Sequence, residues 1–298
     1  MNPGGGSAQS RVLLELCRRF VRPALRVAPL TGAGVRSAFL IEMLAGLRRM
    51  PPGIACDQVR LRGFKLEIVR PSDRLPHPRE GAILYFHGGA FVTCGVNTHR
   101  PIVASLARRT GLPVVNVDYR QLPKTKISGS VDDCLAAYKW LIEQGADPRK
   151  TVFAGDSAGG FLVFATALKA LEAGLPAPAG LVGISPLLDL DCEAKLAHAN
   201  AKLDAFVAPR GLSAVCRIDG RIDGVLDPLL SPVNGTLADL PPALLLVAEE
   251  ELLRCDSELM AQRLRAAGVP VTLQLWRHQV HAFPAVAPNL PESRAALA

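Results

Sequence analysis

A serine between two glycines is the first place where the residue types and spacing of this sequence could do chemistry. The segment Gly155–Gly159 reads GDSAG and follows an apolar run that ends at Ala154. A strand that turns at once into a helix needs neighbours without bulk, and Gly155 and Gly159 meet that need. Such a turn exposes the hydroxyl of Ser157, so we expect this serine to be a nucleophile.

Two other interpretations of this glycine-rich turn are weaker. A dinucleotide-binding turn requires G-x-G-x-x-G after the first strand, whereas this chain has GDSAGG in the middle of its strand pattern. A tight turn without any chemistry is the plainest alternative. If a helix follows Ser157, its first N–H groups, including that of Ala158, point at a developing oxyanion.

A second glycine pair follows the apolar run Ala82–Phe86, where His87–Phe91 reads HGGAF. Gly88 and Gly89 have no side chains, so their backbone can come close to a tetrahedral intermediate. We expect their N–H groups to complete the oxyanion hole. His87 could be taken for a catalytic base, but we expect it to hold the loop by hydrogen bonds.

A nucleophilic serine also needs a base and an acid, and the chain order serine, acid, histidine predicts both after Ser157. His281 lies in a loop past the last expected strand and is preferred to the nearby His278 as the base. The acid should follow the strand at 243–248. The candidates there are Glu249, Glu250, Glu251 and Asp256, and residue types alone do not choose among them.

The elements that must position these residues alternate along the chain. From Phe64 onward, short apolar runs alternate with helical stretches, which predicts a mostly parallel sheet flanked by helices. Expected strands are 64–69, 82–86, 114–119, 151–154, 180–184, 243–248 and 271–276, and expected helices are 101–110, 130–144, 157–173 and 256–267. The stretch Leu188–Ala238 breaks this alternation and is expected to be an insertion, with helical patches around Glu193–Leu203.

The net charge of +7 is concentrated in the first fifty residues. Eight arginines against two glutamates give that segment +6, which leaves +1 for the rest of the chain. Apolar residues recur there at helical spacing, and the charged ones occupy the other face. These apolar residues are Val12, Leu13, Leu16, Cys17 and Phe20. We expect a helix that packs on the protein through them; a helix on an anionic membrane surface is the alternative.

Composition excludes several classes of protein. With 298 residues, 49% of them apolar, and a mean hydropathy of +0.22, the chain can bury a large core and is not disordered. Aromatic residues make up only 5%, which argues against nucleic-acid binding. No apolar stretch is long enough to span a membrane or to form a signal peptide. Seven scattered cysteines without a C-x-x-C pair indicate a reducing compartment. We therefore expect a cytoplasmic protein.

Taken together, HGGAF, GDSAGG and the late histidine resemble the hormone-sensitive lipase family of α/β-hydrolases, which includes bacterial esterases. The resemblance runs from about Ala82 to Phe283 and is supported by VDYR at 117–120 and LPPA at 240–243. Two departures are visible. Ala90 replaces the third glycine of the usual HGGG, and the position that matches the catalytic acid is Glu251 rather than an aspartate. The resemblance thus favours Glu251, with Asp256 second.

The resemblance implies an α/β-hydrolase fold with a helical cap. The cap would comprise residues 1–55 and the insertion 188–238, and the core would comprise 56–187 and 239–298. It also implies a serine carboxylesterase for short- to medium-chain acyl esters, monomeric or homodimeric, without metal or organic cofactor. An amidase or deacetylase with the same triad, or a receptor that binds a small ligand on this fold, are the alternatives.

Overall fold

The computed structural model describes residues 5–27, 33–219, 221–222, 225–226 and 230–298. Its centre is an eight-stranded sheet in the order β1-β2-β4-β3-β5-β6-β9-β10, in which β2 runs antiparallel to both β1 and β4 and the remaining neighbours are parallel. The strands are β1 (Ile54–Leu61), β2 (Phe64–Pro71), β3 (Ala82–Phe86), β4 (Val114–Asp118), β5 (Thr151–Asp156), β6 (Gly180–Ile184), β9 (Ala243–Ala248) and β10 (Val271–Trp276). The predicted α/β-hydrolase sheet is confirmed.

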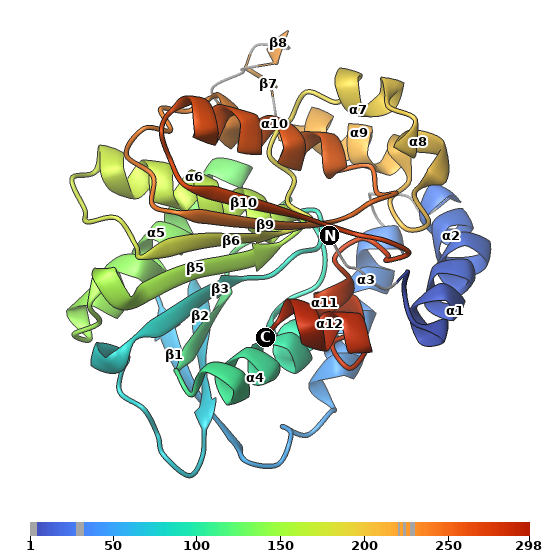
Figure 1. Ribbon diagram of the computed structural model, residues 1–298. Coiled ribbons are helices and arrows are strands. Elements are labelled where there is room, and N and C mark those ends of the chain that lie inside the picture. Colours follow the sequence, from blue (N-terminus) through green and yellow to red (C-terminus); the bar gives the residue numbers. More distant parts are fainter. Residues whose placement is uncertain (1–4, 28–32, 220, 223–224, 227–229) are drawn as a thin grey trace.

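Helices cover both faces of the sheet (Figure 1). One face carries α5 (Ile127–Glu143), α6 (Ala158–Glu172) and α10 (Arg254–Ala266), and the other carries α4 (Val96–Thr110), α11 (Phe283–Val286) and α12 (Pro291–Ala296). Two clusters of buried apolar residues result, one on each face. Strand β3 lies between them and all five of its residues are buried, which explains its uninterrupted apolar sequence.

The parallel order places the chemistry at one edge of the sheet. The carboxyl end of β3 leads into the HGGAF loop, that of β5 into Ser157, that of β9 into the four candidate acids and that of β10 into His281. Because parallel strands all end on the same side, residues from four distant segments meet there. Long-range convergence of this kind follows from the alternating strand and helix pattern.

The two segments expected to form a cap both contain helices. Residues 1–55 hold α1 (Ala8–Leu16), a π-helical turn (Cys17–Val21), α2 (Arg22–Val27) and α3 (Ala33–Gly46), and their last two residues already belong to β1. The insertion holds α7 (Glu193–Ala197), α8 (Asn200–Leu203), α9 (Pro209–Asp219) and the short strands β7 (Arg221–Ile222) and β8 (Val225–Leu226). Figure 1 shows α1, α2, α7, α8 and α9 gathered at one side of the molecule.

The buried face of α1 differs from the expected one. Leu14 and Cys17 are buried, whereas Val12, Leu16 and Phe20 are exposed to solvent. The sequence shows two apolar stripes on this helix, and periodicity alone does not tell which of them packs on the protein. No helix in the described ranges is long and apolar enough to cross a membrane.

Candidate active site

Ser157 occupies a strained turn between β5 and α6. Its backbone has φ 54° and ψ −118°, a conformation that residues with side chains rarely adopt. A Cβ at Gly159 would lie 1.9 Å from the carbonyl oxygen of Phe86, and one at Gly155 would lie 2.6 Å from that of Gly159. Both glycines are therefore required by close backbone contact, and the half-buried Ser157 sits at the N-terminus of α6.

The HGGAF loop approaches this turn, but its amides are used differently from what we expected. The N–H of Gly88 donates to Asp156 Oδ1 at 3.1 Å, so it does not point to a free oxyanion position. The N–H groups of Gly89 and Ala90 donate no hydrogen bond to another described residue. Gly89 has φ +119°, and a Cβ there would lie 1.9 Å from Thr93 O. The structure therefore favours the amides that follow Gly88 as free donors.

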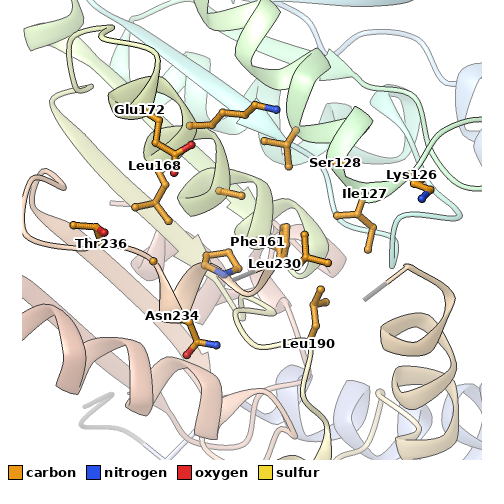
Figure 2. Close-up of a pocket in the computed structure, with 15 residues that line it drawn as sticks. Lys126, Ile127, Ser128, Phe161, Leu168, Glu172, Leu190, Leu230, Asn234 and Thr236 are labelled. Carbon is orange, nitrogen blue, oxygen red and sulfur yellow. The ribbon is translucent and has the colours of Figure 1, made fainter. Parts of the chain in front are cut away.

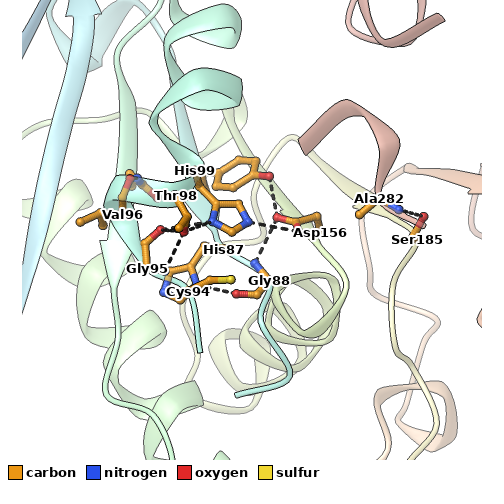
Figure 3. A network of polar contacts seen from close by, with 12 residues as sticks. His87, Gly88, Cys94, Gly95, Val96, Thr98, His99, Asp156, Ser185 and Ala282 are labelled. Atoms are coloured by element: carbon orange, nitrogen blue, oxygen red, sulfur yellow. Dashed lines mark hydrogen bonds and ion pairs between the residues drawn. The ribbon is translucent and has the colours of Figure 1, made fainter. Parts of the chain in front are cut away.

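A buried polar network lies behind the loop (Figure 3). Asp156 Oδ1 accepts from Tyr85 at 2.7 Å as well as from Gly88, and its Oδ2 lies 3.3 Å from His99 Nε2. Burial raises the pKa of Asp156, but His99, Tyr85 and His87 together lower it by more, so the net pKa lies below the usual value. The carboxylate is therefore held as an anion directly before Ser157.

His87 stabilises the loop and is not placed to act as a base. Its ring stacks on Tyr119 at 4.3 Å, and the Tyr119 hydroxyl donates to the carbonyl oxygen of His87 at 2.7 Å. Burial and the neighbouring His99 lower the pKa of His87 to about 3. This histidine is neutral at physiological pH and supports the loop, as expected from the sequence.

His281 and Glu251 lie together at the ends of β10 and β9. The distance from His281 Nδ1 to Glu251 Oε2 is 3.4 Å, and both side chains are buried. This contact is too long and poorly aligned for a hydrogen bond: His281 Nδ1 and Glu251 Oε1 have no hydrogen-bond partner among the described residues. Catalytic contacts of this kind tighten when substrate binds. Burial lowers the pKa of His281, but the carboxylates of Glu251, Asp204 and Asp156 together raise it by more, leaving it above the usual value.

Ser185 joins the two residues, and sequence reasoning missed it. Its hydroxyl donates to Glu251 Oε2 at 2.8 Å and accepts from the N–H of Ala282 at 2.9 Å. Ser185 is fully buried and has φ 48°. One side chain thus connects the carboxylate to the backbone next to His281. The residue follows β6 directly, and that position at the edge where the other site residues gather is the only signal that the sequence offered.

The insertion also holds the loop that carries Glu251. The amide of Asn200 donates to the carbonyl oxygens of Glu249 and Glu251, at 2.9 and 3.0 Å, and Asp204 Oδ2 accepts from the N–H of Leu252 at 2.7 Å. Asn200 and Asp204 are both buried. Sequence reasoning did not single out either residue, because nothing local marks a contact across about fifty positions.

The other acidic candidates have different partners. Asp256 is buried against Lys195, with Oδ1 2.9 Å from Nζ, and its Oδ2 accepts from the N–H groups of Leu188 and Asp189. Glu249 pairs with Arg277 and Glu250 with Arg18, both near the surface. Asp256 therefore joins the insertion to α10, and the structure brings only Glu251 of the four to His281.

An apolar pocket runs along α6 beside this site (Figure 2). It has a volume of about 510 Å³ and is lined mostly by apolar side chains, including Phe161, Ala165, Leu168 and Leu190, with Lys126 and Lys169 at its edge. Phe161 is one helical turn from Ser157 and packs edge-on against Phe91 of the HGGAF loop at 5.4 Å. The pocket therefore begins next to the nucleophile's turn without containing Ser157, Glu251 or His281.

A nucleophile turn, an oxyanion loop and a buried histidine and glutamate at one sheet edge are the features of a serine hydrolase on the α/β-hydrolase fold. Comparison with known proteins agrees. The family described as the α/β hydrolase fold matches residues 83–285. The chain belongs to this family, and within it to the hormone-sensitive lipase group of bacterial serine esterases. The predicted resemblance is confirmed.

Individual relatives support this assignment. Esterase LipU of Mycobacterium tuberculosis is 41% identical over 242 residues, covering 79% of this chain and 81% of the relative. Carboxylesterase/phospholipase LipF of the same organism is 33% identical, covering 98% and 80%. An esterase from the bacterial hormone-sensitive lipase family superimposes with a TM-score of 0.84 at 30% identity, covering 98% of this chain and 95% of that one.

Proposed function

We propose that this protein hydrolyses carboxylic esters through an acyl-enzyme on Ser157. Ser157 Oγ attacks the ester carbonyl while His281 takes its proton, and His281 then gives that proton to the leaving alcohol. A water molecule that the same histidine activates then attacks the acyl-enzyme, which releases the carboxylic acid product and regenerates Ser157. Glu251 orients the imidazole and stabilises its charged form, and the contact of 3.4 Å between Nδ1 and Oε2 is the observation that carries this proposal.

The oxyanion in this proposal is stabilised by backbone amides of two elements. Ala158, the first residue of α6, supplies one donor, and the positive end of the helix dipole adds to its effect. Gly89 supplies a second donor. The engagement of Gly88 with Asp156 leads us to propose Ala90 as the third donor in place of Gly88. Ala90 has φ 55°, a turn conformation that separates its amide from the preceding strand.

The proposed substrates are esters with short- to medium-chain acyl groups. The pocket beside α6 supports this, because it is apolar and starts one turn from Ser157. Names of relatives support it too: one from Streptomyces hygroscopicus, 36% identical over 250 residues, is an acetyl-hydrolase. We expect Ala165→Trp to fill the pocket, which would lower activity on hexanoate and longer esters while acetate hydrolysis is retained. An unchanged acyl-length profile would remove the pocket from the substrate site.

The test of the reaction is nitrophenolate release from p-nitrophenyl butyrate. We expect Ser157→Ala and His281→Gln to reduce kcat by a factor of at least about 10³. Glu251→Gln should also reduce kcat. His278→Gln is the matched control, because His278 is a half-buried loop histidine that has no contact with Glu251. Faster cleavage of a matched anilide than of the ester would favour an amidase. If the unsubstituted protein were no more active than Ser157→Ala, this result would favour a ligand receptor.

A further inference from the structure

The outer surface of the N-terminal helices is unusually apolar. Val12, Leu16 and Phe20 are 59%, 48% and 66% exposed, and their spacing of four residues places them in one row along α1 and the π-helical turn that follows. The same helix is already fixed to the protein through Leu14 and Cys17 on its other side. The exposed row is therefore not needed to hold α1 in place.

Exposed apolar side chains are concentrated in this segment. Of the thirteen large apolar residues that are exposed in the described part of the chain, nine lie between positions 12 and 47. The other six of these nine are Leu25, Leu40, Ile41, Met43, Leu44 and Leu47. Figure 1 shows α1, α2 and α3 on the same side of the molecule. Apolar surface gathered in this way indicates an interaction surface rather than scattered exposure.

The charge of the same segment selects the partner. Arginines flank the exposed apolar residues, and those at the surface are Arg11, Arg18, Arg19, Arg26, Arg48 and Arg49. Glu15 is the only acidic residue on α1, and residues 1–50 as a whole carry +6. Apolar side chains interleaved with arginines are typical of helices that lie in the interface of anionic lipid.

A second copy of this chain fits the surface less well. A symmetric dimer would place the same patch of each copy against the other, and arginines would then face arginines. A lipid surface with negative headgroups neutralises this charge and accepts the apolar row. Arg22 is not part of the surface: it is buried and donates to the carbonyl oxygens of Ala201 and Lys202, which ties the helices to the insertion.

We propose that the outer face of α1 to α3, defined by its exposed apolar residues and arginines, docks on anionic lipid surfaces. Docking is separate from ester hydrolysis, so binding is measured on Ser157→Ala. The full chain is sedimented with vesicles of phosphatidylcholine alone or of phosphatidylcholine mixed with the anionic lipid phosphatidylglycerol. We expect binding to the anionic vesicles only, and we expect it to weaken in high salt.

Two variants and a control separate the contribution of the apolar residues to vesicle binding from that of the arginines. Val12→Ser/Leu16→Ser/Phe20→Ser and Arg26→Glu/Arg48→Glu/Arg49→Glu should each lower vesicle binding about tenfold or more. Leu75→Ser/Val286→Ser removes two exposed apolar residues elsewhere and should bind as before. Introduced into the protein that retains Ser157, all three sets of substitutions should leave the melting temperature and the rate of cleavage of dissolved p-nitrophenyl acetate unchanged. Absence of that cleavage in the protein without these substitutions would question the hydrolase and not the docking surface.

Two results would contradict the docking proposal. Absence of sedimentation with anionic vesicles at low salt would overturn the proposal. So would equal loss of binding in the control variant, because the effect would then not belong to this face. Light scattering gives the alternative partner: a dimer that the Val12/Leu16/Phe20 variant dissociates would identify the face as a subunit interface.

Discussion

His99 Nε2 lies 3.3 Å from Asp156 Oδ2, and this buried pair connects α4 to the residue that precedes Ser157. The other ring nitrogen of His99 lies 3.2 Å from the carbonyl oxygen of Gly95, so both nitrogens face acceptors and the ring is held in its charged form. The other oxygen of Asp156 holds Gly88. The pair therefore fixes the start of the HGGAF loop relative to Ser157.

Replacing one partner of this pair should lower the free energy of unfolding much more than replacing both. His99→Gln leaves the Asp156 carboxylate buried without its cation, which should reduce the free energy of unfolding by about 3–5 kcal/mol. The double variant His99→Gln/Asp156→Asn should recover part of that loss, because two neutral groups replace an ion pair. Urea unfolding of the four proteins in a double-mutant cycle measures the coupling; additive losses would contradict it.

The pH dependence of stability should show the same pair. Burial lowers the pKa of His99, but Asp156 raises it by more, and the net pKa lies above 6.5; that of His281 is raised too. Their contributions are complete below about pH 6.5 and are lost as the pH rises through the folded-state values. His87, with a pKa near 3, has the opposite sign and costs stability as the pH falls from about 6.5 toward 3.

The melting temperature should therefore pass through a maximum near pH 6 to 7 and decline on both sides. In His99→Gln the alkaline decline should become shallower, although Tyr85, His87, Cys94 and Glu42 still surround the site. Melting curves from pH 4 to 9 give the comparison. A decline of the same slope in wild type and His99→Gln would assign the alkaline loss to another group.

Ser185 should affect catalysis more than stability. Ser185→Ala removes the donor to Glu251 and the acceptor for Ala282, so His281 and its acid lose their common support. We expect kcat on p-nitrophenyl butyrate to fall about 10- to 100-fold with little change in KM.

Ser231→Ala is the matched control for Ser185→Ala. Ser231 is equally buried, but its hydroxyl bonds to Leu190 and Asp189, away from Glu251 and His281. It should lose about 1 kcal/mol of stability and keep its kcat. If both variants lost kcat alike, Ser185 would have no special role at the site.

The sheet could be predicted from sequence where strands are buried on both faces. Strands β3, β6 and β9 have the predicted bounds, because runs without polar residues between turn residues are typical of strands in parallel sheets. The edge strand β10 also has the predicted bounds, and its sequence VTLQLW alternates apolar and polar residues. The edge strand β1 was missed. Its exposed side chains include Asp57, Gln58 and Arg60, which hide the apolar signal of a strand that pairs on one side only.

The site could be predicted where function demands a local pattern, and not where it depends on distant contacts. Ser157 and its glycines form one turn, so their spacing is visible in the sequence. Ser185 acts across sixty-six positions and Asn200 across fifty-one, and no local pattern marks either. The hydrogen bond of Gly88 could not be predicted for the same reason: a glycine loop shows that amides can approach another group closely, and only the fold shows that Asp156 accepts from this one.

Gly159 gives the sharpest test of the turn that carries Ser157. A Cβ on this residue would lie 1.9 Å from Phe86 O and 2.8 Å from the carbonyl carbon of His87, and backbone atoms cannot move aside as a flexible side chain can. Gly159→Ala should therefore push β3 and the oxyanion loop away from Ser157. We expect loss of activity together with a stability loss of about 1–3 kcal/mol.

Gly211→Ala is the control: it lies in α9 with nothing within 4 Å of its Cβ, so it should keep full activity and gain up to about 1 kcal/mol from helix propensity. Calorimetry and butyrate hydrolysis on both variants measure this, and an active, stable Gly159→Ala protein would show that the turn tolerates a side chain.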